Sequence, residues 1–309
     1  MPIVWRYIFL GLIASVFLAF LSAFSLTDDK LHLVFCDVGQ GDAALIYRGS
    51  TQILIDGGPD SSVLSCLSGH MPFWDRKIEI VTMTHPQEDH FGGLVDVIRR
   101  YKIDLFIAPP VDNDTAGFRT LKREIEDRKI SEAWSGRAGL KVMNLRTGDI
   151  LRNSLIRIET LWPSYAKASE GKPSNNASNG VLGAMTTKED LNGFSIVQRI
   201  SYGDFDALFT GDIGPPVAEM VAGSDGVGVE ILKVPHHGSK NGLTQGLLDA
   251  ARPKLAVISA GKKNRYGHPH KETIQLLSNA AIKLLRTDLD GKIEVVTDGK
   301  RWWIKSRSN

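Results

Sequence analysis

Residues 84–93 read Thr-His-Pro-Gln-Glu-Asp-His-Phe-Gly-Gly, and no other stretch of the chain says more about its fold. An apolar run rich in Ile and Val leads into it, which predicts a strand, and residues 94–101 carry apolar side chains at helical spacing. His85, Asp89 and His90 lie within six residues of one another. A loop between a strand and a helix can direct all three side chains toward one point, and imidazole and carboxylate are ligands that Zn²⁺ and Mn²⁺ accept. The stretch therefore predicts a metal site at a strand-to-helix junction.

Two later segments offer further ligands, each at the end of an apolar strand. The first, Phe-Thr-Gly-Asp, ends in Asp212, and the second, Val-Pro-His-His-Gly-Ser, contains His236 and His237. Adjacent residues at a strand end point in different directions, so the sequence does not choose between these two histidines.

Two early loops carry carboxylates that can support the ligands. Asp37 and Asp42 follow the first predicted strand, and Asp56 follows the third. Carboxylates in such positions accept a hydrogen bond from a ligating histidine and fix its tautomer. We expect these three to lie behind the metal ligands.

A fourth polar cluster, residues 264–270, again follows an apolar strand. It offers Asn264, Tyr266 and His268 to an anionic substrate, with Arg265 beside them. For His270 we expect an ordinary surface position.

The composition excludes several classes of protein. The chain has 309 residues, a net charge of +2 and 42% apolar residues, which fits a folded domain without an acidic tail or a basic coat. It has two cysteines, which exclude a disulfide framework and a thiolate-rich zinc site. We interpret Cys36 and Cys66 as packing residues.

Residues 1–30 are predicted to form one N-terminal transmembrane helix. No charged residue occurs from Tyr7 to Leu26, a run long enough to span a bilayer. Arg6 precedes the run and Asp28 follows it, so the positive-inside tendency places the rest of the chain on the extracytoplasmic side. The alternative is a signal peptide, followed by secretion of the cleaved chain.

Residues 31–309 are predicted to form one α/β (α+β) domain. Short β-rich runs and intervening helices occur in two similar halves, which suggests two sheets packed face to face and covered by helices outside. The first three strands read as an antiparallel meander. Residues from about 163 to 190 lack apolar periodicity and are predicted to be a flexible surface insertion.

With these residues in hand, the sequence resembles a metallo-β-lactamase-fold hydrolase, and specifically the hydrolase domain of ComEC-type competence proteins, which act in DNA uptake. The matching strings, in chain order, are FCDVGQGDAALI, ILIDGG, THPQEDHFGGL, NGFSIVQRISYGD, LFTGDI, LKVPHHGS and NRYGHPH. The resemblance implies an αββα sandwich with one or two divalent metal ions at one sheet edge. It also implies hydrolysis of a phosphodiester, plausibly in single-stranded DNA, by a metal-activated hydroxide.

Carried onto this sequence, the resemblance implies a defined set of roles. The metal ligands are His85, Asp89, His90, Asp212 and His237, with Gln87 and His236 as further candidates. The catalytic residues are Asp89, which orients the hydroxide, and His268, which contacts the phosphate or protonates the leaving oxygen. The substrate-binding residues are Asn192, Ser195, Ser239, Asn264 and Tyr266.

The sequence departs from the family in two ways. Gln87 stands where the general motif has a second histidine, which favours Mn²⁺ over Zn²⁺ or leaves one metal position empty. ComEC-type channels have many membrane spans, whereas this chain has one candidate, so it cannot form a DNA pore alone.

Two other functions remain open at this point. One is a cell-surface esterase that acts on a small phosphodiester such as a phosphorylcholine compound. The other is a non-catalytic DNA-binding accessory of DNA uptake, which contacts phosphates through basic residues near the site: Lys233, Lys240, Lys262, Lys263 and Arg265. The sequence identifies no protein partner.

Overall fold

The computed structural model describes residues 3–24, 28–134, 139–163, 182–183, 185, 187 and 189–305. The helices are α1 (Ile3–Phe24), α2 (Ser62–Ser68), α3 (Glu88–Phe91), α4 (Leu94–Arg100), α5 (Ala116–Trp134), α6 (Pro215–Ala222), α7 (Gln245–Ala251), α8 (Lys271–Asn279) and α9 (Thr287–Asp290), with 3₁₀ turns η1 (Leu191–Phe194) and η2 (Pro235–Gly238). The strands are β1 (Leu31–Phe35), β2 (Ala44–Arg48), β3 (Thr51–Ile55), β4 (Lys77–Thr82), β5 (Lys102–Ile107), β6 (Lys141–Met143), β7 (Ile150–Asn153), β8 (Ile156–Trp162), β9 (Val197–Tyr202), β10 (Phe205–Phe209), β11 (Ile231–Lys233), β12 (Leu255–Ile258), β13 (Lys283–Arg286), β14 (Ile293–Thr297) and β15 (Trp302–Ile304).

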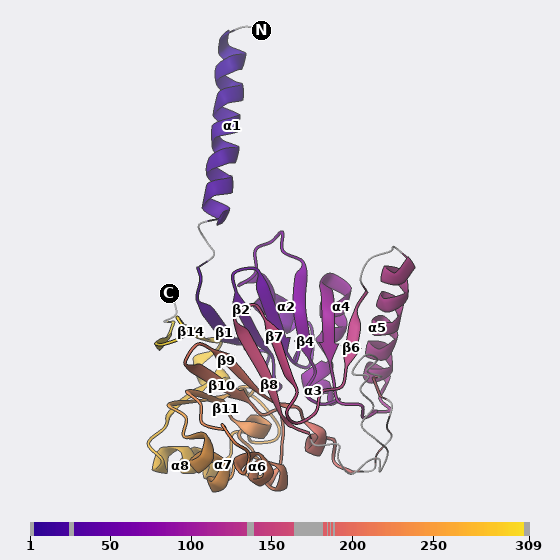
Figure 1. The fold of residues 1–309 in the computed structure, drawn as a ribbon, viewed down its shortest axis with the longest axis vertical. Coiled ribbons are helices and arrows are strands. Elements are labelled where there is room, and N and C mark those ends of the chain that lie inside the picture. The colour runs from indigo at the N-terminus through magenta and orange to yellow at the C-terminus, as the bar shows by residue number, and fades with distance from the viewer. Residues whose placement is uncertain are drawn as a thin grey trace.

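The strands form two sheets (Figure 1). The first has the order β15-β14-β1-β2-β3-β4-β5-β6, and the second has the order β13-β12-β11-β10-β9-β8-β7. The meander β1-β2-β3 is antiparallel, as predicted, whereas β3 to β6 run parallel. In the second sheet β10 to β13 are parallel. Loops that follow parallel strands meet at one edge of each sheet, which is where the predicted ligands lie.

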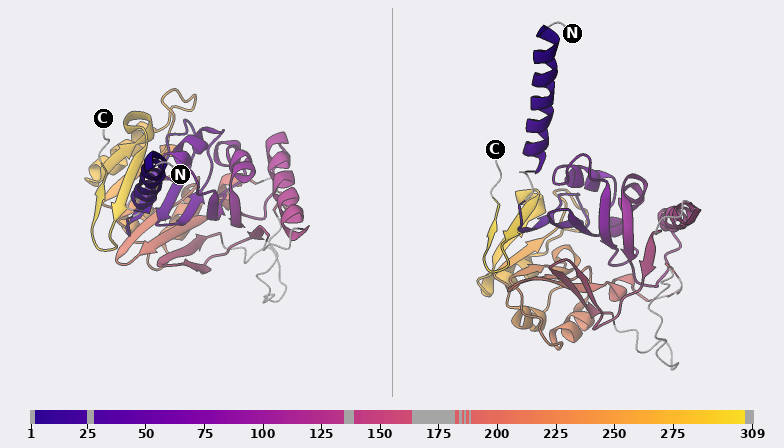
Figure 2. Two further views of the ribbon diagram at one scale, coloured as in Figure 1. Left: turned by 90° about the horizontal axis from the view of Figure 1, so that it is seen from above. Right: turned by 45° about the horizontal axis from the view of Figure 1, so that its top comes forward.

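Successive side chains of a strand point to opposite faces of the sheet, so each sheet packs against an apolar core on both sides. In β1, Leu31, Leu33 and Phe35 face the apolar core between the two sheets, while Val34 faces a second core under the helices of the first half. A third core lies between the second sheet and the helices of the second half. Figure 2 shows helices on both outer sides of the packed sheets. The chain thus has the predicted four-layer αββα sandwich, because its central strands have apolar side chains on both faces.

Several short elements escape prediction. The sequence pattern predicted neither α2 nor α6, and the edge strands β6, β7 and β13 have three or four residues each. The three edge strands contain too few residues to show a period. These short elements complete the edges of the sheets and cover their faces, and they leave the predicted layers unchanged.

The two cysteines correct one prediction. Cys36 and Cys66 form a disulfide between the end of β1 and α2, with Cα atoms 5.8 Å apart. They lie 30 residues apart in the sequence, and only the packing of α2 onto the first sheet brings them together. Cys36 is therefore a cross-link as well as a packing residue.

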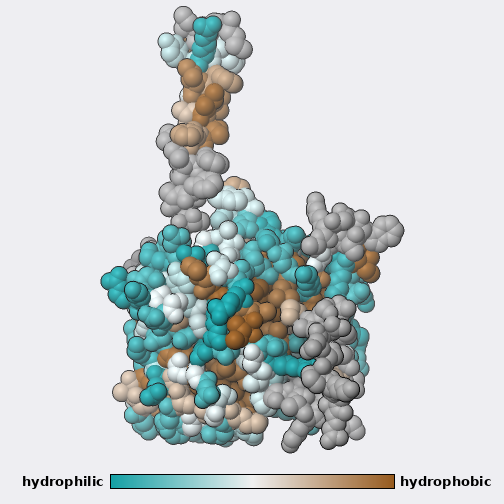
Figure 3. Space-filling model, in the orientation of Figure 1, coloured by the Kyte–Doolittle hydropathy of each residue, from teal (hydrophilic) through white to brown (hydrophobic). Residues whose placement is uncertain are grey.

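The predicted N-terminal helix is present as α1, and Figure 3 shows it projecting from the body of the protein. Its described side chains are largely apolar and exposed, among them Trp5, Phe9 and Phe17. Within the described part of the chain, however, no helix reaches the length and apolar character needed to cross a membrane. The predicted transmembrane anchor is therefore not supported.

The predicted insertion, residues 163–190, lies almost entirely outside the described residues.

Candidate metal centre

The candidate site forms where strands from both halves end. Asp56 and His85 follow β3 and β4 of the first sheet, and Asp212 and His237 follow β10 and β11 of the second. These strand pairs are parallel, β3 with β4 and β10 with β11. Packing the sheets face to face brings the two sets of loops together, so each half contributes part of one site.

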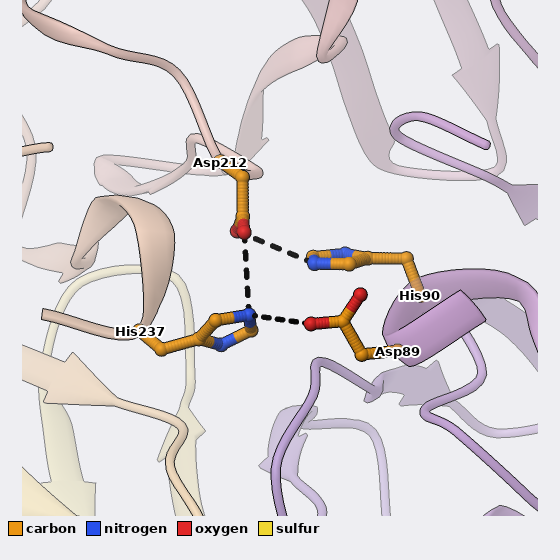
Figure 4. Close-up of side chains that lie close together, drawn as sticks. All are labelled: Asp89, His90, Asp212 and His237. Atoms are coloured by element: carbon orange, nitrogen blue, oxygen red, sulfur yellow. Dashed lines mark ion pairs between the residues drawn. The ribbon is translucent and has the colours of Figure 1, made fainter. Parts of the chain in front are cut away.

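Four side chains form the centre, which we call the metal cluster: Asp89, His90, Asp212 and His237. Asp89 and His90 belong to the short helix α3, and Figure 4 shows them facing Asp212 and His237 from the other half. The Nε2 atom of His90 lies 3.3 Å from Asp212, and the Nε2 atom of His237 lies 3.2 Å from Asp212 and 3.3 Å from Asp89. One ligand atom from each of the four lies within 4.8 Å of the others.

The donor atoms of this cluster fit a divalent cation. His90 Nε2, His237 Nε2 and Asp212 Oδ1 are buried and have no hydrogen-bond partner. Buried polar atoms in native proteins normally make hydrogen bonds, so a convergent group of buried atoms that make none indicates a bound ligand. Two carboxylates and two neutral imidazoles together carry a charge of −2, which one divalent ion neutralises.

A buried carboxylate orients His90. His90 Nδ1 lies 2.8 Å from Oδ2 of Asp56. The same carboxylate accepts a hydrogen bond from the backbone N–H of Thr84 at Oδ1 and one from the Thr84 hydroxyl at Oδ2. An imidazole that donates from Nδ1 leaves Nε2 free as a ligand. Asp56 therefore has the predicted supporting position, and Thr84, at the start of the motif, holds it in place.

The backbone conformation at His236 and His237 determines where the His237 side chain points. Both His236 and His237 have positive φ values, 51° and 52°, a conformation that is costly for residues other than glycine. This turn directs His237 inward, 1% exposed, while its Nδ1 lies 3.1 Å from the carbonyl oxygen of Ser259. The side chain of His236 is 26% exposed, and its Nε2 lies 3.9 Å from Asp212. The structure thus brings His237 into the metal cluster and leaves His236 at its rim.

A buried ion pair lies behind His237. Asp42 contacts His237 Nδ1 at 3.3 Å and pairs with the ammonium group of Lys233, which is 3% exposed. The sequence had suggested Lys233 as a phosphate contact, but its head group points into the protein. Lys233 is the supporting residue that sequence reasoning missed, because a lysine on an apolar strand gives no sign of which carboxylate it meets.

The electrostatics of the cluster follow from its burial. Burial alone would lower the pKa values of both histidines, but Asp212 with Asp56 raises that of His90, and Asp212 with Asp42 raises that of His237, well above the ordinary value. Burial would raise the pKa of Asp212, but both histidines hold it well below its usual range. Without a cation, protons therefore occupy the cluster, and binding a cation there releases them.

His85 lies next to the metal cluster but outside it. Its Nε2 is buried without a partner, and burial together with the nearby His90 lowers its pKa to about 3. A neutral imidazole is available as a ligand. Gln87 is half-buried, and its side chain lies within hydrogen-bond reach of His85. The described residues therefore group four of the predicted ligands closely, with His85 adjacent.

Other predicted residues support the loops of the site. Ser195 is fully buried, and its hydroxyl accepts a hydrogen bond of 3.1 Å from the backbone N–H of Asp212, so it positions that ligand. Asn264 bonds Gly261 and both backbone groups of His268, which braces their loop. Both residues therefore support the loops of the site, and their contact with substrate stays a prediction.

Three further predicted site residues have different surroundings in the structure. Asp37 is exposed, because the turn after β1 directs it away from the metal cluster. The hydroxyl of Ser239 accepts from the N–H of Asn241 at 3.3 Å, inside its own turn. Asn192 is buried in η1, and its Oδ1 has no hydrogen-bond partner.

The rings of residues 266–270 approach the metal cluster from outside. His268 stacks against His237 at 6.2 Å between ring centroids, and Tyr266 stacks against His268 at 5.7 Å. Burial, followed by the neighbouring His237 and His236, lowers the pKa of His268 to about 4. His270 caps α8, and its Nδ1 accepts the backbone N–H of Lys240 at 3.1 Å, a structural role consistent with the expectation for it.

Comparisons with known proteins identify relatives along most of the chain. ComE operon protein 3 of Bacillus subtilis (strain 168) is 28% identical over 279 residues, which cover 84% of this chain and 32% of the relative. Competence protein ComA of Neisseria gonorrhoeae is 25% identical over 273 residues, which cover 86% of this chain and 32% of the relative. The chain thus spans about a third of the length of these curated relatives. No protein-family model matches.

Solved structures show the same fold at low identity. The metallo-β-lactamase fold protein YhfI from Bacillus subtilis matches with a TM-score of 0.50 at 12% identity, covering 89% of this chain and all of that one. A variant of the CmlA β-hydroxylase matches with a TM-score of 0.50 at 14% identity, covering 87% of this chain and 54% of that one.

Proposed function

For this chain, a ComEC-like hydrolase domain of the metallo-β-lactamase fold, we propose a phosphodiesterase activity that cleaves single-stranded DNA. The observation that carries the proposal is the metal cluster, in which buried donor atoms from both halves converge without hydrogen-bond partners. A divalent ion bound there supplies Lewis-acid activation of water and of a phosphoryl oxygen. Zn²⁺ and Mn²⁺ both suit two carboxylates and two imidazoles.

The chain's own residues organise the reacting groups. Asp56 and Asp42 hold His90 and His237 in place, and the N–H of Asp212 is fixed by Ser195. Asp89 is the most exposed member of the metal cluster, so its second carboxylate oxygen is placed to orient the attacking water.

His268 is proposed to contact the phosphate. A group with a pKa of about 4 is neutral near pH 7, so this imidazole can accept or donate one hydrogen bond there. It does not serve as a strong proton donor at that pH. The resemblance implied that His268 either contacts the phosphate or protonates the leaving oxygen, and the lowered pKa favours the contact.

The proposal of DNA as substrate rests on the surroundings of the metal cluster and on the relatives. Residues 261–271, beside the site, contain four lysine or arginine residues and no acidic residue. Phosphates bind such a basic segment in a salt-dependent manner. One of the relatives, competence protein ComA of Neisseria gonorrhoeae, is named for competence, which supports the proposal.

We also propose that the domain works on the extracytoplasmic side of the cell envelope. Disulfides form and persist in oxidising compartments and are rare in the cytosol, and Cys36 is bonded to Cys66. Contact of α1 with lipid belongs to the same proposal, because its exposed apolar side chains need an apolar surface to cover them.

The test is hydrolysis of labelled single-stranded DNA by the full chain in mild detergent, with Mn²⁺ or Zn²⁺ added. Asp89→Ala removes one ligand, and Asp127→Ala removes an exposed aspartate on α5 as a matched control. We expect metal-dependent cleavage that Asp89→Ala abolishes and Asp127→Ala preserves.

A folded, metal-loaded chain that leaves DNA intact contradicts the nuclease proposal. Turnover of a small diester under the same conditions would then favour the esterase. Salt-dependent DNA binding without turnover of either substrate would favour a binding accessory.

A further inference from the structure

A stack of rings leads outward from the metal cluster. His237 is a member of that cluster, His268 stacks on it with planes 29° apart, and Tyr266 stacks on His268 with planes 22° apart. The stack begins at a fully buried imidazole and ends at a tyrosine that is 51% exposed. It therefore joins the reaction centre to the surface through aromatic faces.

The outer end of the stack carries a cation. The Arg265 guanidinium lies 5.1 Å from the centroid of the Tyr266 ring and donates to its hydroxyl at 3.0 Å. Arg265 is exposed, and within the described part of the chain it forms no ion pair with a carboxylate. Its contacts there are with Tyr266, so a ligand can displace it without breaking an ion pair.

The loop that presents the stack is held in a fixed shape. The Asn264 side chain donates to the carbonyl oxygens of Gly261 at 2.8 Å and His268 at 2.7 Å, and accepts the N–H of His268 at 2.9 Å. These bonds close the loop around Tyr266. A ring that is already positioned loses little conformational freedom when a flat ligand stacks on it.

We propose that Tyr266 is a stacking platform for the nucleobase next to the scissile phosphodiester, an inference that rests on the proposed function and adds a subsite to it. The base takes the place of the Arg265 side chain on the tyrosine ring. Arg265, once displaced, meets the adjoining phosphate together with the exposed Lys262 and Lys263. Two ring-to-ring steps, of 6.2 and 5.7 Å, connect His237 to Tyr266, so a single strand whose phosphate is bound at the metal cluster passes close to the tyrosine ring.

This subsite favours single strands over duplexes. Stacking on an aromatic face requires an unstacked base, and it tolerates any sequence because every base has a π face. A small diester without a base gains nothing from Tyr266.

The experiment measures binding of a phosphorothioate oligonucleotide, which resists hydrolysis, to the full metal-loaded chain in detergent. The probe carries 2-aminopurine, whose fluorescence falls on stacking, and an abasic oligonucleotide of equal length retains the charge without the bases. We expect Tyr266→Ala to weaken binding of the base-containing strand by roughly tenfold or more and to leave abasic binding unchanged. Tyr266→Trp should restore both binding and fluorescence quenching.

Phe73→Ala is the matched control, because Phe73 is an aromatic residue 79% exposed before β4, at the opposite edge of the first sheet. It should change neither measurement. Equal weakening of base-containing and abasic binding by Tyr266→Ala, or no weakening of either, overturns the platform.

Cleavage of ordinary DNA is measured in parallel, so the two proposals fail separately. Cleavage with no base-dependent effect of Tyr266→Ala rejects only the platform. Base-dependent binding without cleavage rejects only the nuclease.

Discussion

Two clusters of histidine and carboxylate lie at opposite edges of the first sheet, and they differ in one property. The metal cluster lies where β3 and β4 end. The second, which we call the His32 cluster, lies where β1 begins and consists of Asp28, His32, His70 and Glu294. His32 lies between two carboxylates, 2.8 Å from Glu294 and 2.9 Å from Asp28, much as His90 lies between Asp56 and Asp212.

The two clusters differ in which of their atoms have hydrogen-bond partners. Both ring nitrogens of His32 have a carboxylate partner, and Glu294 is also met by Tyr47 and Lys305. His70 Nδ1 donates to the carbonyl oxygen of Cys66 at 2.8 Å, and its Nε2 lies 3.7 Å from Glu294. In the metal cluster, Nε2 of both histidines and one oxygen of Asp212 have no hydrogen-bond partner. Residue types alone would suggest two metal sites, but unsatisfied buried atoms distinguish the one that needs a ligand.

The comparison predicts the largest loss of activity for Asp212→Asn. Asp212 contacts both histidines, so we expect hydrolysis and bound metal to fall by more than about 100-fold, beyond the roughly 10- to 100-fold cost of losing a residue that only holds a ligand. The measurements are turnover and metal content of the purified chain, with circular dichroism to confirm folding. A variant that retains metal and full activity would place the centre elsewhere.

The disulfide connects the two regions, because Cys36 follows β1 near the metal edge and Cys66 lies four residues before His70. Removing it with Cys36→Ser should lower the free energy of unfolding by about 3 kcal/mol, because the cross-link restricts a loop of 30 residues in the unfolded chain. Chemical denaturation measures the change. Cys66→Ser and reduction of the unaltered chain should reproduce it, and an unchanged midpoint in all three would show that the bond does not form.

Asp56→Asn tests orientation without removing a ligand. An amide can present its NH₂ group to His90 and lose the acceptor, so we expect metal affinity to fall by roughly 10- to 100-fold while the fold persists. Metal titration measures the affinity, and excess metal should restore much of the activity. Failure of excess metal to rescue it would mean that Asp56 has a direct role in the reaction.

We expect Glu294→Gln to lower the free energy of unfolding and to leave metal binding and hydrolysis unchanged. Burial would raise the pKa of Glu294, but hydrogen bonds from His32, His70 and Lys305 hold it well below its usual range. The stability it contributes is therefore fully present above the ordinary value of 4.5 and is lost as pH falls further. We expect the variant to be less stable by about 2 kcal/mol at pH 7 and the difference to shrink below pH 4.5.

Denaturation at several pH values checks this prediction, with metal content and hydrolysis at pH 7 as controls. Loss of metal in Glu294→Gln would show that the two clusters are coupled.

The local patterns predicted much of this architecture. The helix predicted at residues 94–101 is α4, and the sandwich follows from central strands that are apolar on both faces. The edge strand β13 has four residues, too few to show a period. Asp37 and Asp42 lie in the same loop, and only the path of its turn makes one exposed and the other buried.

The sequence by itself determined the chemistry that the molecule can hold, because His85, Asp89, His90 and Asp212 occur in polar segments that follow apolar strands. The tertiary structure decided which of these atoms meet. It selected His237 over His236 through two positive φ angles, turned Lys233 inward to Asp42, and joined Cys36 to Cys66. The physical reason is that these contacts depend on how distant segments pack, as between Asp42 and Lys233, 191 residues apart, whereas periodicity and spacing report only on near neighbours.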